Sequence, residues 1–500
     1  MANDLTITAK GSDAESILQA YEKWGDDCVK HLTGDFAFAI WDGRRQRYFC
    51  ARDHFGVKPF YYTYINNEFA FSSCLNELRP IVSNTLNEIA VGDYLLFGVN
   101  QDLSTTIFKD IQRLKPGHTL TVENGSIMVK PYWTPEPSTE VRYRDPSSYV
   151  EHFSELLSRA VKDRLTEDSV AISMSGGLDS TSLAALAREQ GKDVHGFAVV
   201  YDSLIPDEER HYSTLAAQHL GIPVTHLSAD RYSLFDAQMP GEMDQPEPFL
   251  ISALTGQFND LLRLAAKFSP IMLTGYDGDA FMNVPQPSRL GSVKKKIRRF
   301  IPRKRAATAG RPYSWLDEAF AKRTHLAERW KRPSINQASP LNPIWTALFE
   351  GYDPSSTKLN LEVRHPFMDV RLVEFLSSIP ARPWLINKHI LRVAMKDKLP
   401  SAVLNRPKTP LAGSPALQLV RRGSVRCLDS FEVSPQLRTF VNLDRRRSVA
   451  DEETSDGLWA NLRIFALNYW LANSQPGVQR TSQTQVTKVA ATKNSNAETG

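Results

Sequence analysis

Short apolar runs alternate with longer amphipathic stretches between residues 146 and 273. The short runs have the composition of strands and cover residues 170–174, 195–201, 224–228 and 271–273. The longer stretches predict helices at 149–164, from about 181, at 208–220 and at 254–267. Strands separated by helices form a parallel sheet with helices on both faces, so we expect an α/β, doubly wound parallel-sheet domain. Such sheets bind ligands beyond the carboxyl ends of their strands.

The flanking segments have different patterns. Up to residue 135, a helix at 14–24 with Ser12 or Asp13 as its N-cap precedes several short strand-like runs, and an Asn124-Gly125 turn joins two of them. We therefore expect a separate α+β domain at 1–135 and the α/β domain, with a helical C-terminal part, at 146–474. The polar residues 475–500 predict a disordered tail.

The bulk composition excludes several function classes. No apolar run approaches the roughly 20 residues that span a bilayer, and the first ten residues do not resemble a signal peptide. The net charge of +4 on 500 residues gives no reason to expect a nucleic-acid or membrane partner. The four cysteines form no CxxC pair, which favours reduced thiols. We expect a cytoplasmic protein.

A basic stretch at 294–305 holds eight Lys or Arg residues. It is either a solvated loop or a segment that closes over a nucleotide or binds an acidic peptide. Aromatic residues are sparse in it, which disfavours binding of single-stranded nucleic acid.

The loop "SMSGGLDSTS", residues 173–182, lies between a predicted strand and a helix. Backbone amides at a helix N-terminus attract anions, and glycine lets a phosphate approach the backbone closely. Four residues could surround a phosphate in this way: Ser175, Gly176, Gly177 and Ser180. Asp179 cannot bind phosphate directly, so its place in the loop implies a bridging Mg²⁺. No lysine follows the glycines, which excludes the P-loop of GTPases and kinases.

This loop resembles the pyrophosphate-binding SGGxDS loop of the N-type ATP pyrophosphatases, which have a HUP-like fold and form acyl-adenylates. Four further segments resemble the asparagine-synthetase-like ligases within that group, in the family's order: "GDFAFAIWD" with "ARDHFGVKPFYY", "LTGYDGDAF", "NLEVRHPFMD", and "NKHILRVAMKDKLPSAVLNRPKTP". The resemblance covers about residues 10–470.

The resemblance implies a role for each matching residue. The four loop residues would hold the β- and γ-phosphates of ATP, with Gly275 in the second loop, while Asp179 and Asp279 would hold Mg²⁺. Lys388 matches the catalytic lysine, which stabilises charge on the intermediate and on pyrophosphate. Phe197 and Val199 would lie beside the adenine. Glu362 and Arg364 match a pair that we expect to be structural.

The N-terminal segment departs from the family pattern. It resembles the Ntn-type glutaminase domain, whose nucleophile is a cysteine at position 2, but this chain begins Met1-Ala2. The match to "SDxExILxxYxxxG" starts at Ser12, where Asp13 matches a glutamine-binding acid. Either the start lies too late in the gene, or the domain is a truncated structural remnant.

A second departure is Tyr276, which replaces the family's usual glutamate. β-Lactam synthetases have a tyrosine there and use it with a glutamate to deprotonate the substrate's own amine, and lasso-peptide cyclases also vary at this position. We predict Tyr276 as a catalytic residue, with Glu350 as its partner. Alternatively, Tyr276 only fills space in the pocket.

The sequence therefore predicts a ligase that adenylates a carboxylate and joins it to an amine of its own small-molecule or peptide substrate. A precursor peptide and a companion protease would be further partners. One alternative is a glutamine-hydrolysing asparagine synthase with a truncated N-terminus, although Tyr276 speaks against it. A catalytically silent nucleotide-binding scaffold is another, but it would not need Asp179, Asp279 and Lys388. The lack of cysteine pairs disfavours a tRNA-thiolating enzyme.

Overall fold

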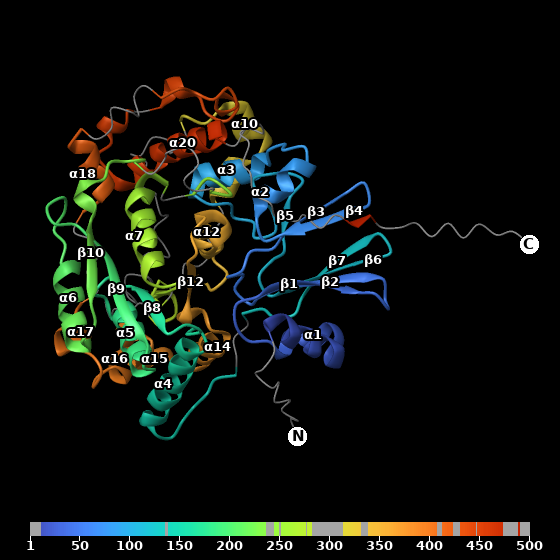
Figure 1. Ribbon diagram of the computed structural model, residues 1–500. Coiled ribbons are helices and arrows are strands. Elements are labelled where there is room, and N and C mark those ends of the chain that lie inside the picture. Colours follow the sequence, from blue (N-terminus) through green and yellow to red (C-terminus); the bar gives the residue numbers. More distant parts are fainter. Residues whose placement is uncertain are drawn as a thin grey trace, which may run out of the picture.

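The computed structural model describes residues 12–135, 139–236, 245–249, 252–276, 278–282, 314–331, 339–407, 413–423, 431–446, 448–473 and 489–490. A larger α/β part and a smaller part built from antiparallel strands lie side by side (Figure 1). The predictions for the basic stretch 294–305, and for the tail 475–500 apart from Val489–Ala490, concern residues outside this described part.

The α/β part is built on a five-stranded parallel sheet with the order β10-β9-β8-β11-β12. Its strands are β8 (Ser169–Ser173), β9 (Asp193–Val200), β10 (Val224–Ser228), β11 (Ile271–Thr274) and β12 (Glu362–Arg364). The chain adds β9 and β10 on one side of β8 and then returns to add β11 and β12 on the other side. The predicted doubly wound parallel sheet is confirmed, and its topological switch point lies between β8 and β11.

Alternating residues of β8 face two different cores. Val170 and Ile172 lie in a core with the helices on one face, whereas Ala171 lies in a core with Leu262 of α7 on the other. The helices are α4 (Pro146–Lys162), α5 (Leu178–Glu189), α6 (Glu209–Leu220) and α7 (Thr255–Phe268). Because both faces of the sheet are buried, a polar ligand can reach the sheet only at the ends of its strands.

Helices from the C-terminal part extend this structure. α14 (Val370–Ser378) and α16 (His389–Ala394) pack on α4, and α17 (Ser401–Asn405) packs on α6. α12 (Pro343–Tyr352) runs between the sheet and the N-terminal part (Figure 1). Among the described residues, no helix combines the length and the apolar composition that crossing a bilayer requires.

The N-terminal part contains two antiparallel sheets and helix α1 (Asp13–Trp24). Ser12, one of the two predicted N-caps, caps this helix through a capping box with Glu15. One sheet has the order β1-β2-β6-β7, from β1 (Ala37–Asp42), β2 (Arg47–Arg52), β6 (His118–Glu123) and β7 (Ser126–Pro131). The other has the order β13-β4-β3-β5, from β13 (Val489–Ala490), β4 (Glu68–Ser72), β3 (Tyr61–Ile65) and β5 (Gln112–Arg113). The predicted turn joins β6 to β7, with positive φ at both Asn124 and Gly125.

The two parts of the molecule share a hydrophobic core. α3 (Glu88–Phe97) packs against α11 (Leu326–Lys331) and α20 (Ser455–Asn473), and α10 (Glu318–Arg323) joins the same cluster. The packing is so close that a Cβ on Gly92 would lie 2.6 Å from Leu326. The N-terminal part is therefore built into the α/β part and is not attached by a linker alone.

Candidate active site

A cavity of about 800 Å³ opens beyond the carboxyl ends of β8 and β11, at the topological switch point. Eight of the sequence-predicted residues line it: Ser175, Gly177, Asp179, Ser180, Gly275, Tyr276, Asp279 and Lys388. Segments that are 200 residues apart in the chain thus meet at the position where doubly wound sheets bind ligands.

The first loop is closed tightly around the start of α5. Gly176 has a φ of 67°, and a Cβ there would lie 2.6 Å from the backbone nitrogen of Ser213. Gly177 is the N-cap of α5, and the Ser175 amide donates to Oγ of Ser180 at 3.2 Å. The loop therefore offers hydroxyls and the positive end of the helix dipole to an anion in the cavity.

The second loop follows β11 and touches the first. A Cβ on Gly275 would lie 2.8 Å from the nitrogen of Ser180, and one on Gly278 would lie 2.7 Å from Cγ of Asp179. The short helix α8 (Gly278–Met282) carries Asp279 next to this contact. Two glycines are thus what allows the two acidic residues to approach each other.

Lys388 lies between these two carboxylates. Its Nζ forms an ion pair with Asp179 and lies 2.8 Å from Oδ1 of Asp279. Burial lowers the pKa of Lys388, but the carboxylates of Asp179 and Asp279 raise it more, so the net pKa lies above the ordinary lysine value. Lys388 is therefore a cation at neutral pH.

The same arrangement fits a divalent cation, because both carboxylates converge on one positively charged group, the Lys388 ammonium. Within the described residues, no three His, Cys, Asp or Glu side chains group into a metal site of their own. Mg²⁺ commonly takes one or two protein carboxylates and completes its shell with water and phosphate oxygens. Asp179 and Asp279 would supply such a pair.

The backbone around Lys388 is strained. Asn387 and Lys388 have φ values of 50° and 56°, a left-handed conformation that costs non-glycine residues about 1 kcal/mol or more each. The guanidinium of Arg392 donates to the carbonyl of Asn387 at 2.8 Å and to that of Arg406 at 3.2 Å. These bonds hold the turn that aims Lys388 into the cavity.

The cavity is also lined by residues that were not predicted as site residues, among them Glu209, Asn387, Arg392 and Arg406. Arg406 donates to Oε1 of Glu209 at 3.2 Å and lies 4.2 Å from the ring centroid of Tyr212. Burial raises the pKa of Glu209, although Arg406 opposes this shift. Both arginines lie in the segment that identified Lys388, so their nearness to it in sequence was the available signal.

Other predicted residues are absent from the lining that the described residues define, namely Gly176, Phe197, Val199 and Glu350. Gly176 acts through the backbone of the loop. Phe197 is 3% exposed and stacks with His195, with ring centroids 4.5 Å apart, in the core that also contacts Val199. The prediction that Phe197 and Val199 lie beside the adenine stays a prediction.

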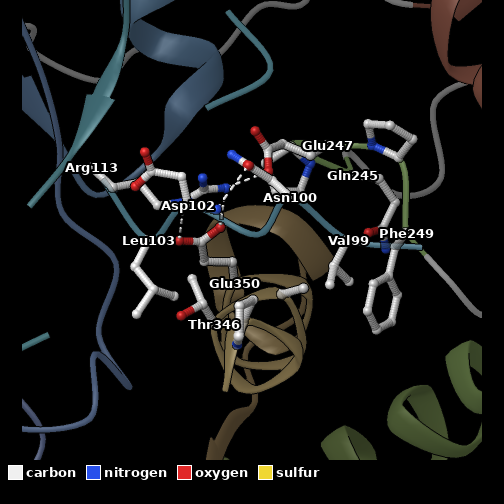
Figure 2. A pocket seen from close by; sticks show the side chains of 14 residues that line it. Val99, Asn100, Asp102, Leu103, Arg113, Gln245, Glu247, Phe249, Thr346 and Glu350 are labelled. Carbon is white, nitrogen blue, oxygen red and sulfur yellow. Dashed lines mark hydrogen bonds and ion pairs between the residues drawn. The ribbon is translucent and has the colours of Figure 1, made fainter. Parts of the chain in front are cut away.

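Tyr276 lies at the mouth of the cavity and is 41% exposed. Its ring stacks on that of Tyr352, and the two hydroxyl oxygens are 3.5 Å apart with Tyr352 as donor. Glu350 forms an ion pair with Arg113 at 2.8 Å (Figure 2). It also lies 3.5 Å from Nη2 of Arg52. The described contacts thus join Tyr276 to Tyr352, and the pairing of Tyr276 with Glu350 stays a prediction.

The predicted structural pair is observed, since Arg364 donates to Glu362 at 3.0 Å. The described cysteines are poor candidates for a nucleophile, because burial raises the pKa of Cys28 to about 11 and also raises the pKa values of Cys50 and Cys74. A thiol is nucleophilic only as its thiolate, and burial lowers the thiolate fraction of these three side chains.

Comparison with known proteins agrees with this geometry. Residues 152–472 match the family model described as asparagine synthase, and residues 3–133 match one described as a glutamine amidotransferase domain. Glutamine-hydrolyzing asparagine synthetase 3 of Bacillus subtilis (strain 168) is 27% identical over 439 residues, which cover 80% of this chain and 70% of the relative.

Two further relatives have the names of different enzymes, one an asparagine synthetase and the other an amidase. Glutamine-hydrolyzing asparagine synthetase 2 of the same strain is 27% identical over 445 residues, covering 80% of this chain and 58% of the relative. Amidase chyE of Penicillium rubens (strain ATCC 28089 / DSM 1075 / NRRL 1951 / Wisconsin 54-1255) is 30% identical over 241 residues, covering 45% of this chain and 35% of the relative. The chain thus spans between about a third and 70% of the length of these three relatives.

Proposed function

Because the chain belongs to the asparagine synthase family of ATP-dependent carbon–nitrogen ligases, we propose that it activates a carboxylate as its adenylate and then forms an amide. The main support for the proposal is that Lys388 forms ion pairs with Asp179 and Asp279 beside the glycine-rich loop at the start of α5. This set combines groups that hold phosphates with a cation that can stabilise developing negative charge.

In the first step, a carboxylate oxygen of the substrate would attack the α-phosphorus of ATP. The bond from that phosphorus to the bridging oxygen breaks, and pyrophosphate leaves. Ser175, Ser180 and the amides at the start of α5 would hold the β- and γ-phosphates. Mg²⁺, when bound by Asp179 and Asp279, supplies positive charge that screens the phosphates. Lys388 would turn from the carboxylates toward the leaving group.

In the second step, an amine would attack the acyl carbon, so that AMP leaves and an amide forms. An ammonium group cannot attack until it loses a proton. We assign the acceptor of that proton to Tyr276, whose hydroxyl receives a hydrogen bond from Tyr352 at the mouth of the cavity. A phenolate at Tyr276 would be stabilised by this bond.

We further propose that the amine belongs to the substrate itself, as in lasso-peptide cyclases and β-lactam synthetases. Tyr276 supports this, because β-lactam synthetases have a tyrosine at the matching position. Partners would then be a small-molecule or peptide substrate with both groups, and a precursor peptide with its companion protease. The alternative is a glutamine-hydrolysing asparagine synthase whose N-terminus is truncated in this sequence.

ATP–pyrophosphate exchange tests the proposal, with aspartate and candidate peptides as substrates, each with and without ammonia. We expect no exchange with aspartate, but exchange and AMP release with a peptide, and a product lighter by one water. Exchange with aspartate, and asparagine formed from ammonia, would instead identify an asparagine synthase.

Two variants test the site itself. Asp179→Asn and Lys388→Ala should each lower exchange by at least a hundredfold with little change in melting temperature, because both side chains lie at a polar cavity. Lys398→Ala is the matched control, since Lys398 forms an exposed ion pair with Glu189 and should be replaceable. Retained exchange in both site variants would refute the assignment.

A further inference from the structure

A cluster of buried charges joins the N-terminal part to the α/β part. Arg113 of β5 forms ion pairs with Glu350 of α12 and with Glu247 (Figure 2). Arg52 of β2 also pairs with Glu350. Arg52 is 0% exposed, Arg113 is 4% exposed and Glu350 is 3% exposed. Two buried cations thus face the buried Glu350 and the partly exposed Glu247, across a junction between segments more than 130 residues apart in the chain.

The space beside this cluster does not explain it as a binding site. The adjoining cavity is lined by residues from the segments 99–113, 245–249 and 343–350, and it has a volume of about 30 Å³. Ligand pockets for small molecules usually measure about 300 Å³ or more. The charges therefore serve the junction between the two parts and not a bound substrate.

The Arg113–Glu350 contact has the geometry of a rigid link. Nε of Arg113 donates to Oε1 of Glu350 at 2.8 Å, and Nη2 donates to Oε2 at 2.9 Å. Such a two-point contact fixes direction as well as distance. Glu350 lies in the last turn of α12. Its carbonyl oxygen accepts a hydrogen bond from Oγ of Ser356 at 2.7 Å, which ties this turn to the segment that follows the helix.

The same turn of α12 reaches the second loop of the candidate active site by one direct contact and by one that runs through His365. Tyr352 stacks on Tyr276, with ring centroids 6.2 Å apart. Phe349 contacts the ring of His365 at 4.6 Å, and Nδ1 of His365 lies 3.0 Å from Oγ1 of Thr274, the last residue of β11. Tyr352 therefore contacts Tyr276 directly, whereas Phe349 reaches Thr274, just before the second loop, through His365.

We propose that Arg113 is a positioning residue for the ligase site, which holds the last turn of α12 through Glu350 and thereby orients Tyr352 and Tyr276. The N-terminal part then contributes to catalysis without containing a reacting group. The inference rests on the proposed function for its kinetic part only. It also gives Glu350 a role that its contacts support, as the anchor of α12.

Arg113→Met tests this in the full-length protein, with Arg329→Met as the matched control. Arg329 also forms an ion pair between the two parts, with the buried Asp93 of α3, but it lies on α11 and not on α12. Both variants should lower the melting temperature. Arg113→Met alone should raise hydrogen exchange at least fivefold in peptides covering 343–352 and 271–276.

The kinetic readout separates positioning from general destabilisation. With a substrate that supports turnover, Arg113→Met should lower kcat for amide formation at least tenfold, while KM for ATP and ATP–pyrophosphate exchange change less than twofold. Arg113→Lys should recover part of kcat, because it keeps the charge but loses the two-point contact. If Arg113→Met does not fold, Arg113→Lys is used in its place for the hydrogen-exchange and kinetic measurements.

Equal exchange in α12 for Arg113→Met and Arg329→Met would overturn the inference, as would equal losses of kcat. A wild-type protein without activity on any carboxylate would refute the proposed function instead. The hydrogen-exchange comparison would still decide whether Arg113 holds α12.

Discussion

Two neighbouring buried residues of the N-terminal part have pKa values that move in opposite directions. Burial lowers the pKa of His54 to about 4, although the carboxylates of Asp369 and Asp35 raise it. Burial, with Asp35, raises the pKa of Asp53 to about 6, although backbone amides and Arg52 lower it. Aromatic side chains enclose His54, with ring centroids at 5.3 Å for Tyr132 and 5.4 Å for Trp133.

These shifts predict a specific pH dependence for His54→Phe. Unfolded histidine binds a proton below its ordinary pKa of about 6.5, whereas native His54 stays neutral down to about 4. Wild-type stability from this group is therefore complete above pH 6.5 and is lost as pH falls to 4. Measured against wild type by urea unfolding, the free energy of unfolding of His54→Phe should gain roughly 3 kcal/mol between pH 7 and pH 4.

The difference between wild type and His54→Phe isolates His54, because Asp53 is present in both proteins and its contribution cancels. Without this subtraction Asp53 would mask His54, since its effect on stability has the opposite sign. Native Asp53 takes up its proton near pH 6 and unfolded aspartate near 3.9, so Asp53 adds stability as pH falls through this window. His219→Phe, at an exposed position on α6, is the control for replacing a histidine by phenylalanine. A flat difference for His54→Phe would mean that His54 takes up its proton in the native protein.

At the scale of elements, the candidate site depends on how closely two loops approach. A Cβ on Gly275 would lie 2.8 Å from the nitrogen of Ser180 and 3.0 Å from Cβ of Asp179. Both atoms belong to the rigid start of α5, so the second loop would have to move away. Gly275→Ala should therefore separate Asp279 from Asp179 and weaken ATP binding at least tenfold in a calorimetric titration with Mg²⁺.

Gly43→Ala is the matched control for this prediction. Gly43 lies in the turn between β1 and β2, where a Cβ would meet only Nε1 of Trp41, at 3.7 Å. The control should bind ATP as the wild type does. Unchanged binding in Gly275→Ala would show that the approach of the two loops is not needed to hold the nucleotide.

The regular elements of the α/β part were predictable because their signals are local. The strand predicted at 224–228 has those bounds in the structure, and the helix predicted at 208–220 begins one residue later. The helix after β8 begins at Leu178 and not near 181, because Gly177 caps it and the glycine-rich loop occupies fewer residues than its composition suggested. Helix starts in such loops depend on backbone geometry that composition does not encode.

The site was predictable only where a motif marked it. The loop residues, Asp279 and Lys388 meet in one cavity, as the motifs implied. The contact of Tyr276 with Tyr352 could not be predicted, because it depends on where α12 ends relative to the sheet. The ion pair of Glu350 with Arg113 joins residues 237 positions apart and has no local signal in the sequence.

At the scale of the whole molecule, the N-terminal and α/β parts meet through hydrophobic packing as well as ion pairs. Phe320 of α10 is 0% exposed and lies in one cluster with residues of α3 and α20. Arg463 of α20 donates to the carbonyl oxygens of Leu95 and Leu96 at the end of α3, at 3.2 and 2.7 Å. The C-terminal helix thus caps a helix of the N-terminal part.

This shared core predicts that α3 and α20 unfold as one unit. Phe320→Ala should remove about 3–5 kcal/mol of packing from it, as large-to-small changes at buried aromatic positions do. Hydrogen exchange at low denaturant should then rise equally in α3 and α20 and rise less in α5, which lies in a separate core. Phe153→Ala is the converse control, since Phe153 packs with α5 and should loosen that helix while leaving α3 and α20 protected. A rise confined to α3 would mean that the N-terminal part opens by itself, and Arg113 could then not hold α12 in place.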